Sequence, residues 1–226
     1  MRGAYESQSR DKVWGLNGGE HVTASEITHA WRSSMKQLIH LPVLAITALT
    51  VGIFASFAKA EVIYTKTDVT ISGNGLLKID LNHDGITDVT IVSSGAAHPC
   101  PGGPPGSYGS VYAVPAPGNG VAANYNYALA LNSGTRIRPT QSFYDAEALM
   151  IWYNSCAWPP HENDGDWLNV SNRYLGLRFQ IKGHTHYGWA RLSVNEGRVG
   201  PIVTLTGYAY ETIAGQAITT GQTSGP

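Results

Sequence analysis

The sequence predicts an all-β domain, an antiparallel β-sandwich or jelly roll with at most a short helical segment, preceded by an N-terminal signal helix. Short runs rich in β-branched and aromatic residues alternate at period two, and Gly, Asn, Asp and Pro separate them. The chain contains 26 Gly and 12 Pro, which supply turns. Charged residues make up only 14% of it, too few for a charge-driven disordered protein.

Residues 38–57 form an uncharged apolar run near the N-terminus. Basic residues precede this run and an A-x-A sequence ending at Ala60 follows it, so residues 35–60 have the three parts of a secretory signal peptide. We expect cleavage after Ala60 and a secreted or periplasmic product. An uncleaved membrane anchor is the alternative, because about 20 apolar residues can span a bilayer.

Residues 1–34 form a polar N-terminal extension without helical or strand periodicity. Met35 would open a leader of conventional length, so we expect it to be the true start. A long cytoplasmic segment before the signal peptide is the alternative. Residues 61–226 are then expected to form a single β-sandwich domain with no membrane contact after cleavage.

The charge balance excludes several classes of partner. Residues 61–226 contain 9 Lys and Arg and 12 Asp and Glu. A nucleic-acid-binding protein usually shows a basic surplus or stripe, so we expect no nucleic-acid partner. An extracellular glycan and further copies of the chain itself are the expected partners.

Strands are expected at nine runs of alternating residues. The clearest pair flanks Lys182-Gly183, which predicts a β-hairpin. Leu175, Leu177, Phe179 and Ile181 share one face of the first strand of this hairpin, and we expect that face to contact the core. The nine runs are residues 62–65, 68–71, 76–79, 88–92, 110–114, 127–131, 174–181, 187–194 and 202–210.

Two further segments are less regular. Residues 142–153 favour a short helix, because Ser142 and Asp145 have the spacing of a capping box, or else a buried strand. Residues 94–120 contain six prolines and are expected to form a long surface loop.

The two cysteines, Cys100 and Cys156, predict a disulfide. An exported chain with two cysteines has one possible intramolecular pairing in an oxidising compartment. Closing a loop of this length would stabilise the fold by about 4 kcal/mol in the chain-entropy model. A free thiol and an intermolecular bridge are the alternatives.

One motif, at residues 80–88, indicates a specific ion. It follows the pattern D-x-N-x-D-G-x-x-D between two expected strands. Calcium takes six to eight oxygen ligands, and alternating side chains followed by a glycine turn bring such oxygens to one point. The expected metal ligands are the side chains of Asp80, Asn82 and Asp84, the backbone carbonyl of Ile86, and Asp88 directly or through water. A solvated turn without an ion is the alternative, although three such close carboxylates would repel one another.

This loop resembles the calcium loops of FG-GAP repeats in integrin-type propellers, where strands flank a D-x-[DN]-x-D-G-x-x-D turn. The resemblance covers residues 80–88 and occurs once, so it implies calcium as a bound ion and does not imply a propeller. We expect a structural ion that fixes the hairpin.

Two further groups of polar residues have side chains that could bind a metal, although their patterns are weaker. His161, Glu162, Asp164 and Asp166 would supplement the first site or form a second one, with a plain polar turn as the alternative. His184 and His186 share a strand face, as in cupin metal sites. Where a cupin needs a Glu, this chain has Arg191, and zinc sites usually use three protein ligands.

The sequence contains no G-x-S-x-G, P-loop or H-E-x-x-H motif, and no catalytic residue is assigned. Asp145 with Glu147, or Glu162 with Asp166, would have the composition of a glycosidase pair, but such pairs arise by chance in a chain with this many carboxylates. Aromatic rings can stack on sugars, and Trp158 and Trp167 are the candidate ligand-binding residues.

The C-terminal part resembles the end of a widespread group of exported bacterial proteins without an assigned activity; the resemblance covers Arg173 to Val194 and residues 202–212 and 217–222. In some members of that group a PEP-type C-terminal sorting anchor follows, whereas this sequence ends in T-S-G-P. The resemblance implies a bacterial exported β-domain and no catalytic residues.

These observations favour an exported, non-catalytic β-domain that calcium stabilises and that serves as a cell-surface, matrix, structural or binding module. A carbohydrate-binding protein, a hydrolase of an extracellular polymer and a self-assembling extracellular structural protein are the alternatives. Low charge and many strands favour the last of these, because they promote pairing between sheet edges.

Overall fold

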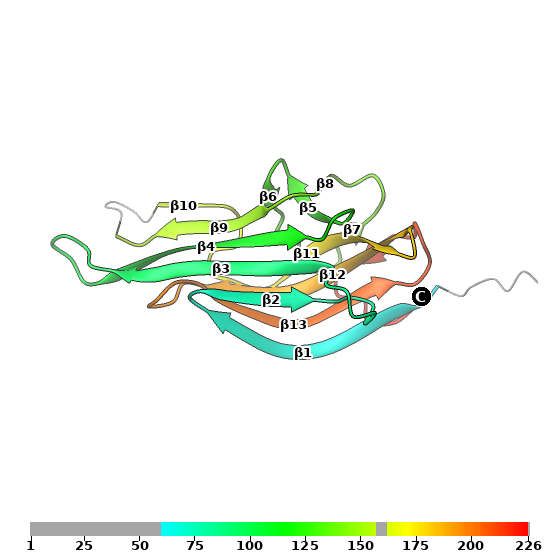
Figure 1. Ribbon diagram of the computed structural model, residues 1–226, viewed down its shortest axis with the longest axis horizontal. Coiled ribbons are helices and arrows are strands. Elements are labelled where there is room, and N and C mark those ends of the chain that lie inside the picture. The colour runs from blue at the N-terminus through cyan, green and yellow to red at the C-terminus, as the bar shows by residue number, and fades with distance from the viewer. Residues whose placement is uncertain (1–59, 157–161, 226) are drawn as a thin grey trace, which may run out of the picture. The chain divides into compact units, whose positions relative to one another are not determined.

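The computed structural model describes residues 60–156 and 162–225, and these residues contain strands and turns but no helix (Figure 1). The predicted all-β class is therefore confirmed. No helix that could cross a membrane occurs in this part of the chain. The strands are β1 Val62–Ser72, β2 Gly75–Ile79, β3 Val89–His98, β4 Gly106–Pro115, β5 Gly120–Asn124, β6 Tyr127–Ala128, β7 Arg136–Ile137, β8 Phe143–Tyr144, β9 Ala148–Asn154, β10 Glu162–Asp164, β11 Val170–Ile181, β12 His184–Asn195, β13 Ile202–Glu211 and β14 Ile218–Thr219.

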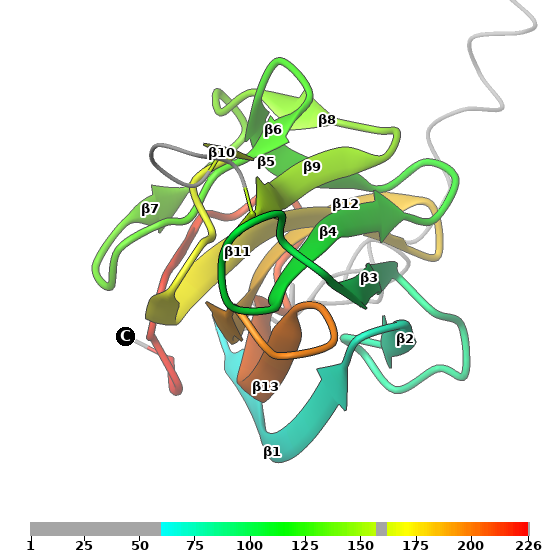
Figure 2. The ribbon, with the colours of Figure 1, turned by 90° about the vertical axis from the view of Figure 1, so that its left-hand side faces the viewer.

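Twelve of these strands form one sheet, in the order β1-β13-β12-β11-β5-β6-β9-β4-β3-β2, with β10 beside β9 and β8 beside β5. One pair, β6 with β9, is parallel, and the other pairs in this sheet are antiparallel. The sheet curls until β1 and β2 lie close together (Figure 2). No ladder joins these two described strands, so an open seam runs between them.

The expectation of a sandwich or jelly roll was therefore wrong, because the structure is one nearly closed barrel. The reason lies in β5, which pairs with β11 at Val121 and with β6 at Ala123. Its backbone hydrogen bonds thus continue the sheet between the two walls of the barrel. Inward and outward residues alternate in both architectures, so the sequence pattern does not distinguish them.

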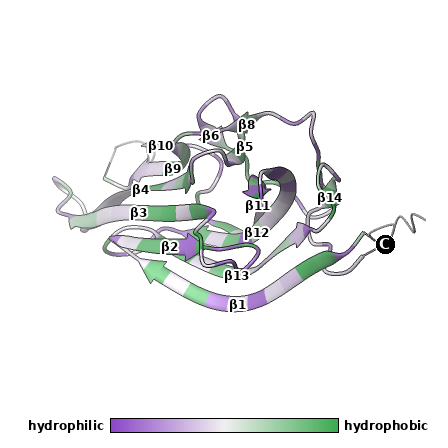
Figure 3. Ribbon diagram, turned by 45° about the vertical axis from the view of Figure 1, so that its right-hand side comes forward, coloured by the Kyte–Doolittle hydropathy of each residue, from purple (hydrophilic) through white to green (hydrophobic). Residues whose placement is uncertain are grey.

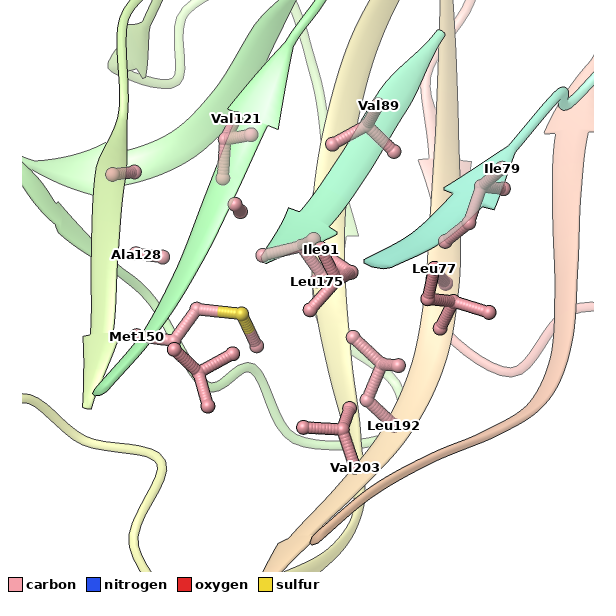
Figure 4. Close-up of a cluster of buried hydrophobic side chains, with 14 of the residues drawn as sticks. Leu77, Ile79, Val89, Ile91, Val121, Ala128, Met150, Leu175, Leu192 and Val203 are labelled. Carbon is pink, nitrogen blue, oxygen red and sulfur yellow. The ribbon is translucent and has the colours of Figure 1, made fainter. Parts of the chain in front are cut away.

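Apolar side chains from nearly every long strand fill the barrel (Figure 4). Val89 and Ile91 of β3 point inward and are 1% and 0% exposed, whereas the residues between and after them are half-buried. Figure 3 shows the resulting mixture of hydrophobic and hydrophilic residues along the strands. The barrel interior is thus the main core, and the strand alternation positions it.

The β11–β12 hairpin confirms the turn predicted at Lys182-Gly183. Both residues have positive φ, 50° and 79°, which is the backbone of a type I′ turn. The side chains expected on the core face do contact the core. Leu175, Leu177 and Phe179 are buried and Ile181 packs against them.

A second apolar cluster covers the outer face of the same hairpin. Trp189 is 0% exposed and packs edge-on against Tyr174, with ring centroids 5.1 Å apart. Ile137 and Ile218, which pair in the two-stranded β7–β14 ribbon, belong to this cluster. The β11–β12 wall is therefore buried on both faces.

Of the two less regular segments, residues 142–153 follow the strand alternative, and residues 94–120 differ from the expected loop. Residues 142–153 form β8 and β9 and no helix, because β9 lies between β4 and β6, where its apolar residues are needed on the inner face. The expected loop over residues 94–120 contains the end of β3, all of β4 and the start of β5. Its prolines lie in the connections or at the end of β4, where a missing N–H is tolerated.

We predict that Leu175→Ala lowers the free energy of unfolding by about 2–5 kcal/mol, because it leaves a cavity in the main core. Leu76→Ala removes the same atoms from a side chain that is 63% exposed and is the matched control, with an expected effect within about 0.5 kcal/mol. Denaturant unfolding of the purified variants measures both. Equal losses in the two variants would contradict the position of the core.

Candidate functional site

The predicted calcium loop, residues 80–88, connects β2 to β3 and crosses the open seam. Leu81 is 1% exposed and lies so close to Gly188 of β12 that a Cβ added there would be 2.9 Å from its Cδ2. His83 Nε2 and Thr65 Oγ1 of β1 are hydrogen-bonded at 2.9 Å. The ring of His83 also lies 5.8 Å from that of Tyr208 in β13. The loop is thus fixed to strands on the far side of the seam.

Backbone N–H groups organise the first carboxylates of the loop. Asp80 Oδ2 accepts a hydrogen bond from the Gly85 N–H at 2.8 Å, and Asp80 Oδ1 accepts one from Asp84 at 3.3 Å. Asp84 Oδ1 accepts from the Ile86 N–H at 2.8 Å. Gly85 has φ of 87°, which explains why a glycine stands at this position. The two carboxylates are therefore held in place by the loop itself.

Asn82 lies between these carboxylates in sequence and contains an unsatisfied oxygen. Its Nδ2 donates to Asp84 Oδ2 at 3.0 Å, and this bond is the main cause of the lowered pKa of Asp84. The Oδ1 of Asn82 is buried and has no hydrogen-bond partner. A buried acceptor without a partner costs free energy, and a cation would satisfy it.

Asp88 points inward and is only 6% exposed. Its Oδ2 accepts a hydrogen bond from the Leu81 N–H at 2.8 Å and its Oδ1 accepts one from Asn119 Nδ2 at 3.2 Å. Burial raises the pKa of Asp88 from 3.8 to about 6; these hydrogen bonds act against the increase, and the charges of Asp80 and Asp84 add to it. Asp88 thus joins the loop to the β4–β5 connection.

The donor set fits calcium in part. Within the described residues, no group of three His, Cys, Asp or Glu side chains has the arrangement of a metal site. A cation here would have to combine Asp80 and Asp84 with neutral oxygens, namely the Asn82 amide and the Ile86 carbonyl, and with water. Hard oxygen donors of this kind suit calcium. Both oxygens of Asp88 already accept protein hydrogen bonds, which favours contact through water over direct coordination.

The predicted disulfide between Cys100 and Cys156 is confirmed, with 5.2 Å between the Cα atoms. It joins the β3–β4 connection to the residues that follow β9. Gly106, the first residue of β4, lies directly against it, since an added Cβ would be 2.8 Å from Cys100 Sγ. The bond therefore fixes the end of the barrel opposite the calcium loop.

The tryptophans selected from the sequence do not form an exposed site in the described structure. Trp167 is 0% exposed, and its Nε1 donates to the Ala128 carbonyl at 2.9 Å, so its ring belongs to the core and is not available to a ligand. Trp158 lies outside the described residues. The exposed aromatic rings are elsewhere.

Three other aromatic residues occupy the outer face of β4 and β9, which we call the aromatic face: Tyr108, Tyr112 and Trp152. Tyr108 is 45% and Trp152 is 38% exposed, and Tyr112 is half-buried. Trp152 lies opposite Ser110, midway along β4 between the two tyrosines. The sequence contained a signal for this face, because Tyr108 and Tyr112 alternate with inward-facing residues in G-S-Y-G-S-V-Y-A-V.

The weaker polar groups remain apart or serve the fold. Asp164 is exposed and accepts a hydrogen bond from Tyr127 Oη at 2.7 Å. His186 is buried, with Nδ1 2.9 Å from the Glu211 carbonyl, whereas His184 is exposed. Asp145 and Glu147 are both exposed before β9, and Asp166 is exposed before Trp167. His161 and the side chain of Glu162 lie outside the described part of the chain.

No protein-family model, curated protein or solved structure matches the chain. Function is therefore inferred from its own residues and their geometry.

We predict that stability in calcium-free buffer falls as the pH rises from about 4 to about 6, because the folded state holds the Asp88 proton more tightly than the unfolded state does. The loss is complete above the folded-state pKa. Urea unfolding in EGTA at a series of pH values measures it. Asp88→Asn removes the titrating group, so its profile should be flatter over this range; an unchanged slope would show that other groups cause it.

Proposed function

We propose that this protein is an exported, non-catalytic binding module that uses the aromatic face to bind a polysaccharide and a calcium ion to hold the β2–β3 loop. One observation supports this function most: exposed aromatic rings lie together on the outer face of hydrogen-bonded strands. Rings in such positions are held rigidly, so little conformational entropy is lost on binding. Carbohydrate binding is thus the binding function that the geometry favours.

The chemistry of the aromatic face suits sugar rings. An aromatic ring has a negative face that attracts the C–H groups of a pyranose, and it also provides a large apolar contact. Tyr108 and Tyr112 are four residues apart on one strand, about 13 Å, and Trp152 lies between them on the neighbouring strand. The three rings would therefore follow a chain of several sugars.

Polar groups flank the rings. Ser94 and Ser110 pair across β3 and β4, with Ser110 opposite Trp152, and Asn154 lies opposite Tyr108. Asp164, in β10, lies opposite Trp152 of β9. Hydroxyl, amide and carboxylate groups beside a stacking surface supply the hydrogen bonds that sugar hydroxyls need. This combination also favours polysaccharide over a purely apolar partner.

Calcium is proposed as a structural ion. The unsatisfied Asn82 oxygen and the carboxylates of Asp80 and Asp84 support it, and the loop that contains them crosses the seam of the barrel. A bound cation would join the loop atoms without any change in fold. Because it would bind the folded state only, it would stabilise the protein by mass action.

The proposed location is the periplasm or the exterior of a bacterial cell, after removal of residues 35–60 as a signal peptide. The disulfide supports this location, since such bonds persist in oxidising compartments. A polymer hydrolase is less well supported, because Asp145 and Glu147 are both exposed and the aromatic face is an open surface.

For calcium, we predict that 10 mM CaCl₂ raises the melting temperature by about 5 °C relative to EGTA, given a dissociation constant of about 10⁻⁴ to 10⁻³ M. Asp84→Asn should abolish most of this shift, because it removes one charge and keeps the acceptor for the Ile86 N–H. Asp68→Asn, on β1 outside the loop, is the matched control. Identical melting in calcium and EGTA would reject the ion site.

For the aromatic face, we predict that Trp152→Ala lowers polysaccharide affinity at least tenfold, because a central tryptophan in an interface contributes on the order of 2 kcal/mol. Tyr125→Ala is the control, since Tyr125 is 85% exposed but lies in the β5–β6 turn outside this face. A glycan array first identifies the ligand, and calorimetry then compares the variants. A blank array with folded, calcium-loaded protein would refute carbohydrate binding.

A further inference from the structure

A groove separate from the aromatic face contains two arginines. It has a volume of about 570 Å³ and lies between β7 and the residues that precede β14. Arg136 and Arg138 line one side, and Gly215 and Gln216 line the other. Arg136 lies in β7 and Arg138 follows this strand directly; both line the groove, with their Cα atoms roughly 7 Å apart.

The groove has a rigid frame. Ile137, between the two arginines, is 0% exposed and pairs with Ile218, which is equally buried. The Gly215 N–H donates to the Thr185 carbonyl at 2.8 Å, which fixes the opposite side. The two walls are thus attached to the barrel, and the groove does not depend on a free loop.

The charge of the groove is uncompensated. Both arginines are exposed, and within the described residues neither guanidinium has a hydrogen bond or an ion pair. No Asp or Glu lines the groove. Glu211, two residues before Ile213, is 1% exposed and accepts a hydrogen bond from the Ile213 N–H at 3.0 Å. Asp145, the acidic residue nearest to Arg138 in sequence, does not line the groove. The two neighbouring cations therefore repel each other, although residues 61–226 as a whole contain more acidic than basic side chains. A bound anion would relieve this repulsion.

We propose that this groove is a binding site for carboxylate groups of an acidic polysaccharide. A guanidinium donates two parallel hydrogen bonds to a carboxylate, and two arginines that flank Ile137 would bind either one carboxylate from two sides or two successive ones. The Gln216 side chain makes no hydrogen bond to any residue that the structure describes, and its amide would bind a sugar hydroxyl. The choice of a polysaccharide rests on the proposed function, whereas the anion site rests on the groove alone.

The test compares a galacturonan with its fully methyl-esterified form, in which neutral methyl esters replace the charged carboxylates. Calorimetry on the purified protein at fixed free calcium should show at least tenfold tighter binding of the acid form. Arg136→Gln with Arg138→Gln should remove this preference, and the double Lys variant should retain part of it, because charge remains but the paired hydrogen bonds do not. Arg198→Gln changes an exposed arginine outside the groove and should bind as the unaltered protein does.

Several results would overturn the site. They are equal binding of the acid and ester forms, an unaffected double Gln variant with an unchanged melting temperature, and an equal loss in Arg198→Gln. Sulfated dextran and inorganic phosphate test whether the groove prefers sulfate or phosphate to carboxylate. Tighter binding of either one than of galacturonan would overturn the carboxylate assignment. If Trp152→Ala binds galacturonan normally while the double Gln variant does not, the result supports the anion site in the groove and refutes binding by the aromatic face.

Discussion

The architecture depends on a seam that no backbone ladder closes. The sheet curls almost fully round, but its edge strands, β1 and β2, do not pair. Side chains connect the two edges instead, and the hydrogen bond of His83 with Thr65 is the clearest case. At the end of the seam away from this loop, the Asn74 side chain in the β1–β2 turn donates to the Gly95 carbonyl and accepts from the Gly95 N–H in β3. Ser93 Oγ donates to the Gly73 carbonyl of the same turn at 2.7 Å.

This constraint explains why the loop between β2 and β3 has so much internal order. A connection that only turned the chain would not need a buried leucine, a buried aspartate and a network of carboxylate hydrogen bonds. Asp88 extends the network through Asn119, which accepts a hydrogen bond from the Gln180 N–H at 3.1 Å. One loop thus connects strands on three sides of the barrel. The aromatic face lies on the β4–β9 part of the barrel wall, whereas the arginine groove lies beside the separate β7–β14 ribbon.

Sequence reasoning identified features that local chemistry decides. Lys182-Gly183 fixed a turn because few residues accept positive φ at two successive positions, and two cysteines allowed one pairing. It did not identify features decided by distant contacts. Trp167 follows an acidic, turn-rich segment and reads as exposed, yet it fills the core beside Ala128. The pattern of residues 148–153 is compatible with both a helix and a strand, because only their position between β4 and β6 determines their conformation. Continuity of the sheet likewise depends on β5, and nothing in the sequence of its five residues predicts that they connect the two walls of the barrel.

The pairing of β1 with β13 sets the order in which the chain can complete its fold. Val62 lies opposite Glu211, so the first long strand has no neighbour on its paired side until nearly the whole domain has been synthesised. Contacts across so many residues form slowly, because the intervening chain must first be brought together. A polypeptide that emerges strand by strand therefore stays open until its last long strand arrives. This late closure is compatible with the proposed export, because a chain that is still open can pass through a secretion channel before it folds.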